Sequence, residues 1–486
     1  MNKKMTCAAL LFAALFTLTG CAGVSKEMAF NEVQQQVDER MGVPIHWNAN
    51  TASVDEIEQM VQELLDRPLE ADTAVQIALL HNRRLQATYE DLGIAYAAVV
   101  EAGSPANPAV HGDATFGLPQ DPDTAHPAHD HYVFQIEMDF LSFLYGSMRK
   151  SAAKSEFETA KLRVTAAVMD LSGQTRTAFY RVQADKQMLE MFRQIALATE
   201  TGYDFARQLH EAGNIPELDL LLQQTLYKRA KLGLADAEVS LVDSREQLNR
   251  LMGLWGEKTA WTLETRLPDI PTELAIEPDK VEVVAVENSI DLAIARGEII
   301  SIGRQLGVAK AMSLVPHLDI GAELEQEAGV WSAGPVLGFE IPLFDRKQGQ
   351  RAAAAAELRR RQEEYYALAV EIRSAVRAAQ RRLQAAQQTA LSYQNEILPL
   401  QEKILEQVQL QYNAMQVGTP RLLLAKQQQI DAGRDYIQAL YNYHVSRVAF
   451  DQILNGRMVS NTTDLSLSQG SNAVRHLDST AAEGGH

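Results

Sequence analysis

Histidine and acidic residues gather in one short stretch of the 486-residue sequence, around His126-Pro-Ala-His129-Asp130-His131. Imidazole and carboxylate groups at this density suit zinc or copper. A solvated polar loop has the same composition, so we assign no metal site to the chain. Should a site exist, its candidate ligands are His126, His129 and His131.

A second set of acidic residues lies in segments where apolar and polar residues alternate, at 110–118, 132–140, 318–325 and 337–341. Such alternation predicts β-strands with one apolar face. A segment of about nine residues suits a tilted membrane-spanning strand, although a half-buried soluble sheet gives the same pattern. The polar side carries no Lys or Arg, and its carboxylates are Asp113, Glu137, Asp139, Asp319, Glu323, Glu325 and Glu340.

If that polar side lines a channel lumen, its carboxylates favour the passage of cations. The acidity of the whole chain, which has a net charge of −18, explains them equally well. The same charge argues against a nucleic-acid partner, because the chain would repel phosphates.

One of the two cysteines ends the run Leu18-Thr19-Gly20-Cys21, after two lysines and an apolar stretch too short to span a bilayer. The run resembles the lipobox of bacterial lipoproteins. That resemblance implies that Cys21 carries lipid, which anchors the chain to the outer membrane. The alternative is an ordinary signal peptide with a chance cysteine.

The elements around these residues occur twice, because Glu137 and Gly253 recur at an offset of 203 as Glu340 and Gly456. Each copy is predicted to contain a helix, two strands, a very long helix, a turn and a helix. The predicted divisions are a signal peptide at 1–20, a tether with a short helix at 21–68, repeats at 69–255 and 279–456, a linker at 256–278 and a disordered tail at 457–486.

The long helices are predicted from the absence of breakers. No proline occurs between 147 and 210, and Pro399 is the only expected kink between 350 and 417. Sixty-odd helical residues span roughly 90 Å. Apolar residues recur every three or four positions, which predicts antiparallel coiled-coil hairpins that turn near Gly213 and Gly418.

Four strands cannot close a barrel, and lipid does not tolerate an open sheet edge. Two copies would give eight strands with a filled interior, whereas three would give twelve strands around a bore. We therefore expect a homotrimer in contact with outer-membrane lipid.

The duplicated pattern resembles the TolC-like outer-membrane efflux family. The likeness is carried by LPLQEKI at 398–404, YNAMQVGTP at 412–420 and FEIPLFD at 339–345. It implies an α+β membrane protein whose trimer closes a twelve-strand β-barrel on a twelve-helix α-barrel extending into the periplasm. The implied partners are a periplasmic adaptor (membrane fusion protein) and an inner-membrane efflux pump. Within the family, the sequence most resembles lipid-anchored members that work with heavy-metal or drug pumps of the resistance-nodulation-division type.

The resemblance also assigns the hairpin tips to contacts with the adaptor. The tip pattern of the family, a glycine followed six residues later by an aspartate and aliphatic residues, fits Gly213 and Asp219. The second tip has Leu424 at the acidic place. The adaptor-contacting residues implied in this way are Gly213, Asp219, Leu220, Gly418 and Thr419.

The sequence contains no nucleophile elbow, phosphate-binding loop or His-Glu-x-x-His run, so we expect neither an enzyme nor a cofactor. The expected function is a passive outer-membrane channel that conducts heavy-metal cations or drugs from a pump to the exterior. Two alternatives remain open: a duct for type I protein secretion, and a periplasmic coiled-coil scaffold lipoprotein without a pore.

Overall fold

The computed structural model of the chain describes residues 26–47, 52–116, 130–264, 266–271, 280–313, 318–327, 329–344 and 346–459. The predicted signal peptide, Cys21, His126 and His129 lie outside these residues. The helices are α2 (Lys26–Met41), α3 (Ala52–Leu65), α4 (Ala71–His81), α5 (Arg83–Gly103), α6 (Leu141–Glu211), α7 (Glu217–Met252), α8 (Val281–Glu287), α9 (Ile290–Met312), α10 (Gln348–Ser392), α11 (Leu398–Asn413) and α12 (Thr419–Leu454). The strands are β1 (Ala109–Thr115), β2 (His131–Asp139), β3 (Leu318–Glu327) and β4 (Val330–Phe339), and the short turns are η2 (Gly256–Thr259) and η3 (Tyr393–Ile397).

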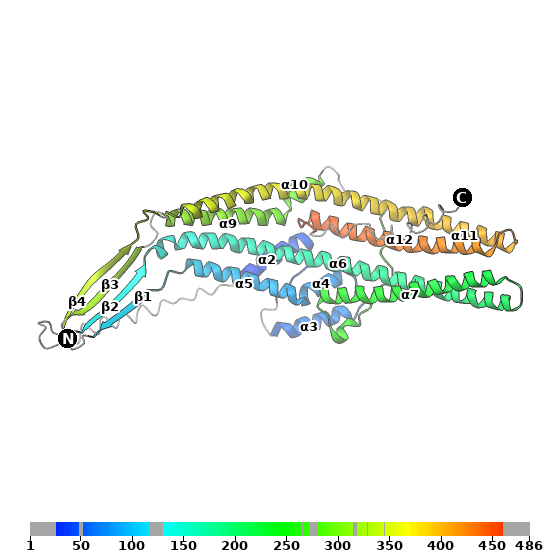
Figure 1. Cartoon of the computed structure of the whole chain (residues 1–486), viewed down its shortest axis with the longest axis horizontal. Coiled ribbons are helices and arrows are strands. Elements are labelled where there is room, and N and C mark those ends of the chain that lie inside the picture. Colours follow the sequence, from blue (N-terminus) through cyan, green and yellow to red (C-terminus); the bar gives the residue numbers. More distant parts are fainter. Residues whose placement is uncertain are drawn as a thin grey trace, which may run out of the picture. The chain divides into compact units, whose positions relative to one another are not determined.

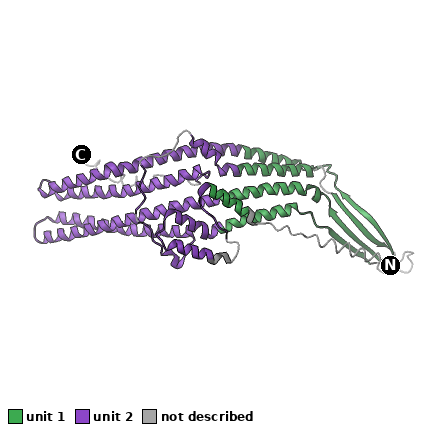
Figure 2. Cartoon of the chain, turned by 180° about the vertical axis from the view of Figure 1, so that it is seen from behind, with its two compact units in different colours: residues 1–39, 86–165, 294–362 green, residues 40–85, 166–293, 363–486 purple. Residues whose placement is uncertain are grey.

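The chain forms two compact units, which are coloured separately in Figure 2. Unit 1 comprises residues 1–39, 86–165 and 294–362, and unit 2 comprises residues 40–85, 166–293 and 363–486. Each unit therefore draws on both predicted repeats. Strands from both halves pair in one sheet of unit 1, and helices from both halves pack together in unit 2.

The sheet of unit 1 is antiparallel, with the strand order β1-β2-β3-β4 (Figure 1). β2 and β3 join the two halves of the chain, with a register from His131↔Glu327 to Asp139↔Asp319. Paired residues point to the same side, so Ile136 shares a face with Val110 and Ala322. The alternation predicted for the four segments is confirmed, and it gives the sheet one apolar and one polar face.

The ends of the strands differ from the prediction. β4 begins at Val330 rather than at Leu337, so Trp331 lies in the strand and not in a loop. The first part of β4 was not predicted as a strand because it contains Gly334 and Pro335, and both residues usually mark turns. Within the protomer β4 is an edge strand, the place in a sheet where proline is usually found. Glu340 follows the last residue of β4 and is not part of the strand.

The long helices are confirmed. α6 runs unbroken for 71 residues from Leu141 to Glu211. α10 and α11 are joined by the π-helical turn η3, which directly precedes Leu398 and Pro399. Proline lacks an N–H and clashes with the carbonyl four residues earlier, and a wider turn accommodates both defects. Among the described residues, no helix has both the length and the apolar character needed to cross a membrane.

The same joint occurs at equivalent places in both halves of the chain. Asn82 Nδ2 donates to the carbonyl of Leu251 at 2.8 Å, and Asn288 Nδ2 donates to that of Leu454 at 3.1 Å. Gly253 and Gly456 follow with φ of 71° and 100°, in the left-handed region that favours glycine. A Cβ on Gly253 would come within 2.7 Å of the His81 carbonyl. These glycines therefore end α7 and α12 where another helix approaches closely.

The C-terminal tail begins later than predicted. Arg457, assigned to the disordered tail by sequence, is hydrogen-bonded to Asp170 of α6 and Asp291 of α9 within unit 2. The Met458 N–H also donates to Asp291 at 2.9 Å. Residues from 460 onward lie outside the described part of the chain. The predicted tether is also more structured than expected, since it contains both α2 and α3.

Candidate functional site

The apolar face of the sheet is exposed in the protomer. Ile136, near the middle of this face, is 43% exposed, and Leu337 on the edge strand β4 is 64% exposed. An ordinary soluble sheet buries such a face against a second layer. This face instead presents a continuous set of large apolar side chains, which are Val110, Phe134, Ile136, Ile320, Leu324 and Leu337.

Aromatic side chains flank that face at both ends of the strands. At one end, Phe116 contacts Tyr132 edge-on with ring centroids 6.0 Å apart, and Trp331 lies on the same face. At the other end, Phe140 follows β2 and Phe339 ends β4. Tyr132 and Phe140 are separated by about 26 Å along an extended strand. An apolar band of about 25 Å between aromatic rings is typical of strands that span the outer membrane.

The polar face of the sheet carries the predicted carboxylates. The strand register places six of the seven together on it: Asp113, Glu137, Asp139, Asp319, Glu323 and Glu325. The seventh, Glu340, lies just beyond β4. Sequence reasoning missed Glu327, which pairs with His131 and Val330 on the same face. Extending the alternation of β3 by one more pair of residues would have found it. The four strands contain no Lys or Arg.

Two histidines lie among these carboxylates. His111 Nε2 is 3.0 Å from Glu137 Oε1, and His131 Nε2 is 2.7 Å from Glu325 Oε1. His131 was expected in a loop with His126 and His129, but it is the first residue of β2. Within the described residues, no group of three or more His, Cys, Asp or Glu is arranged to hold a metal ion. The other two candidate metal ligands, His126 and His129, lie outside those residues and stay candidates from the sequence alone.

The two hairpin tips in unit 2 turn in similar ways with different residues. After α6, Gly213 takes a φ of 73°, and its N–H donates to the His210 carbonyl at 2.8 Å. After α11, Met415 takes the corresponding left-handed conformation with a φ of 57°. Gly418 has a φ of −86° and serves as the N-cap of α12. The hairpin thus turns near Gly418 as predicted, but the left-handed residue is Met415, three positions earlier.

Two predicted tip residues contact each other. Thr419 Oγ1 donates to Asp219 Oδ2 at 3.1 Å, which links the first turn of α12 to the first turn of α7. Thr419 is only 8% exposed, so its hydroxyl serves this link. Gly213 and Gly418 are exposed, and Leu220 is half-buried. The structure thus brings Asp219 and Thr419 together and leaves the outer surface of the tips to the other residues.

We expect Thr419→Val to loosen the two hairpins relative to each other. Valine keeps the shape of threonine but removes the hydroxyl, which costs about 0.5–1.5 kcal/mol. Spin labels at Ala212 and Gln416, both exposed, should then give a broader distance distribution in pulsed EPR of spin-diluted protein. Thr201→Val is the matched control, because Thr201 bonds only within α6. An unchanged distribution would show that the link does not hold the tips.

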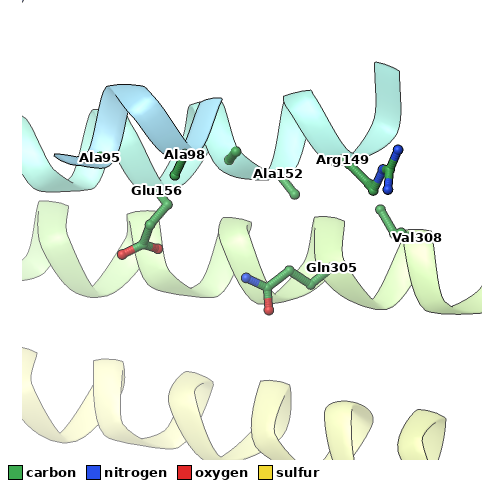
Figure 3. A pocket seen from close by; sticks show the side chains of 8 residues that line it. Ala95, Ala98, Arg149, Ala152, Glu156, Gln305 and Val308 are labelled. Carbon is green, nitrogen blue, oxygen red and sulfur yellow. The ribbon is translucent and has the colours of Figure 1, made fainter. Parts of the chain in front are cut away.

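Unit 1 also contains a cavity of about 370 Å³ between α5, α6 and α9 (Figure 3). Its lining is mostly small and apolar, and it consists of Ala95, Ala98, Arg149, Ala152, Ala153, Glu156, Gln305 and Val308. The charged groups already have protein partners, since Glu156 binds Arg163 at 2.8 Å and Arg149 donates to the Ser142 carbonyl at 3.1 Å. The cavity therefore presents no set of converging groups for chemistry.

Comparison with known proteins relates this geometry to one family. The sequence profile of the outer membrane efflux protein family matches residues 74–254. A curated relative, the cobalt-zinc-cadmium resistance protein CzcC of Cupriavidus metallidurans, is 24% identical over 312 residues. That alignment covers 63% of this chain and 73% of CzcC.

Solved structures share the fold. A membrane protein from Pseudomonas aeruginosa superposes with a TM-score of 0.69 at 16% identity, over 79% of this chain and 92% of its own. The outer membrane protein VceC from Vibrio cholerae gives a TM-score of 0.66 at 16% identity, over 80% of this chain and 97% of its own. Together with the amphipathic sheet and the paired helical hairpins, these findings show that residues 74–254 match the outer membrane efflux protein family and that the chain has the fold of, and is similar to, outer-membrane transport proteins, which are not enzymes.

Proposed function

We propose that three copies of this chain join their sheets into one twelve-strand β-barrel and form the outer-membrane channel of a tripartite efflux system. In this arrangement the apolar face of the sheet contacts lipid and the polar face lines the lumen. The channel is passive, and an inner-membrane pump acting through a periplasmic adaptor supplies the driving force.

One observation carries this proposal, namely the division of the sheet into an exposed apolar face and an acidic one. β1 and β4 are the edges of the sheet, and lipid does not tolerate unpaired edges. Pairing β4 of one copy with β1 of the next removes every edge. Twelve strands leave a water-filled bore, whereas eight strands fill theirs with side chains.

The hairpin tips of unit 2 are the proposed contact with the adaptor. Leu218 and Met415 are exposed there beside Gly213 and Gly418, and the link between Asp219 and Thr419 holds the two hairpins together. Exposed apolar residues at the tips suit a protein partner. The sequence contains no phosphate-binding loop, so in this proposal the partner pump supplies the energy.

We propose metal cations as the substrate class. The name of the relative CzcC refers to cobalt, zinc and cadmium resistance. The polar face supports the same class for this chain, because its seven strand carboxylates favour cations over anions. Two imidazoles lie on the same face, each paired with a glutamate: His111 with Glu137 and His131 with Glu325. Imidazole is a ligand that transition-metal ions accept, so these groups suit the same substrate class.

Planar bilayer recordings of the purified full-length protein test this function. We expect ion conductance with a reversal potential that indicates cation preference in KCl and CoCl₂ gradients. The double variant Glu323→Gln with Glu325→Gln should conduct with a reduced preference, because two carboxylates per copy leave the lumen. Asp236→Asn with Glu238→Gln, on exposed positions of α7, is the matched control and should behave as the parent.

Absence of conductance under every condition would rule out the channel and favour the scaffold alternative. Conductance without cation preference would contradict the proposed substrate class but not the channel. Export of a polypeptide by cells that carry this chain with an ATP-driven transporter would favour type I secretion.

A further inference from the structure

The ends of α6, α9 and α10 that adjoin the sheet in unit 1 carry two successive bands of residues (Figure 1). The band next to the strands is apolar and exposed, and it consists of Phe140, Phe143, Leu144, Ile341, Leu343 and Phe344. The next band is basic, and it consists of Arg149, Lys150, Lys154, Arg304, Lys310, Arg346, Lys347 and Arg351. We call these eight basic residues the basic collar.

Contacts between the helices show that parts of the basic collar lie at one height beside the sheet. The Tyr145 hydroxyl of α6 donates to the Ala311 carbonyl of α9 at 3.1 Å. Arg361 of α10 binds Glu298 of α9 at 3.3 Å. Antiparallel helices rise equally per residue, so Gln348, which precedes Arg361 by as many residues as Ala311 follows Glu298, lies level with Ala311. The first turn of α6, the end of α9 and the start of α10 are therefore level.

Basic side chains reach this height from all three helices. Lys310 lies in the last turn of α9, and Lys347 directly precedes α10. Arg149 Nη2 donates to the Ser142 carbonyl at 3.1 Å, so its guanidinium extends back toward the sheet. The Nε of Arg149 is buried and has no hydrogen-bond partner among the described residues. The guanidinium thus keeps a donor for which the described part of the chain supplies no acceptor.

The region is positively charged in a chain that is acidic as a whole. The segments within 15 residues of the strand ends are 94–108, 140–154, 303–317 and 340–354. Together they contain the eight residues of the basic collar and three acidic residues, Glu101, Glu340 and Asp345. Asp345 lies outside the described residues. The net charge of these segments is therefore +5 per copy, whereas that of the whole chain is −18.

The order of the bands matches the layers of a lipid leaflet. The apolar face of the sheet comes first, the exposed aromatic residues follow, and the basic collar comes last. Phe143 and Lys150 lie on the same face of α6, because seven residues make about two turns, and they are about 10 Å apart along the helix. Aromatic side chains mark the interface of a membrane, and clustered Lys and Arg beside a membrane-spanning segment attract anionic headgroups.

We propose that the basic collar binds the headgroups of anionic phospholipids in the leaflet of the outer membrane that faces the periplasm. The exposed apolar band contacts the upper parts of the acyl chains, and the collar supplies donors and positive charge to the phosphates. The proposal rests on the lipid contact of the apolar face in the proposed function, and it adds the class of lipid that this contact selects. Charge complementarity and continuity with the apolar face identify lipid as the partner.

Native mass spectrometry of the purified full-length protein tests this binding. With equal amounts of phosphatidylglycerol and phosphatidylcholine that carry the same acyl chains, the protein should retain several-fold more phosphatidylglycerol. Lys150→Gln with Lys310→Gln should reduce this ratio several-fold. Lys403→Gln with Lys426→Gln, on exposed positions of α11 and α12, removes the same charge from unit 2 and should leave the ratio unchanged. Lys150→Arg with Lys310→Arg keeps the charge and should keep the preference.

Three results would overturn the proposal. Equal retention of the two lipids by the parent, or an unchanged ratio in the glutamine variant, would show that the basic collar does not select lipid, and bilayer conductance would leave the channel intact. Displacement of phosphatidylglycerol by an equal concentration of soluble glycerol 3-phosphate would show an anion site and not a lipid site. A parent that forms no trimer and conducts no ions in bilayers of either lipid would overturn the proposed function together with the lipid site.

Discussion

Replacing Ile136 with arginine should prevent the protein from assembling in the outer membrane. Ile136 lies near the middle of β2 on the apolar face, paired with Val110 and Ala322. An arginine facing lipid near the bilayer midplane costs about 2–4 kcal/mol, and a trimer carries three of them. The heat-resistant trimer in outer-membrane fractions should therefore disappear from mildly denaturing gels.

The neighbouring residue is the matched control for this prediction. Gln135 points to the opposite face, where it pairs with His111 and Glu323 and donates to Glu137 at 3.0 Å. Gln135→Arg should assemble normally, because its charge meets carboxylates and water instead of lipid. It should also reduce the preference for cations. If both variants assembled equally well, the assignment of the two faces would be wrong.

The strands could be predicted because their chemistry is local. Alternation alone located β2 and β3 to within two residues and placed Glu323 and Glu325 on the polar face. It could not locate the start of β4, because Gly334 and Pro335 have the composition of a turn. The segment is a strand because it pairs with β3, and that pairing is a property of the assembled sheet rather than of the segment.

The candidate site was harder to predict where residues distant in sequence meet. The distance of 194 positions between His131 and Glu325 gives no local signal for their contact. The tips show a different limit. Glycine is the residue most often found in the left-handed conformation, so the sequence pointed to Gly418. The residue that adopts this conformation is Met415. The side chain of Met415 is exposed, so the surrounding protein does not hinder that conformation.

Arg457 was likewise missed because a polar C-terminal segment has the composition of a disordered tail. Its guanidinium donates to both oxygens of Asp170, from Nε at 2.9 Å and from Nη2 at 2.7 Å, and Nη1 binds Asp291. These hydrogen bonds, foremost those to Asp170, raise the pKa of Arg457 despite its partial burial. One side chain thus joins the end of α12 to α6 and to the start of α9.

We expect Arg457→Met to destabilise unit 2 by about 2–4 kcal/mol, because it leaves two partly buried carboxylates without their counter-ion. The midpoint of thermal unfolding in detergent, followed by circular dichroism, should fall accordingly. Arg447→Met is the matched control. Its pair with Asp451 is one helical turn away and almost half exposed, so its loss should cost about 0.5 kcal/mol. Adding Asp170→Asn to Arg457→Met should recover part of the lost stability, since one unpaired charge is removed. Equal effects of the two arginine substitutions would show that Arg457 acts as an ordinary surface residue.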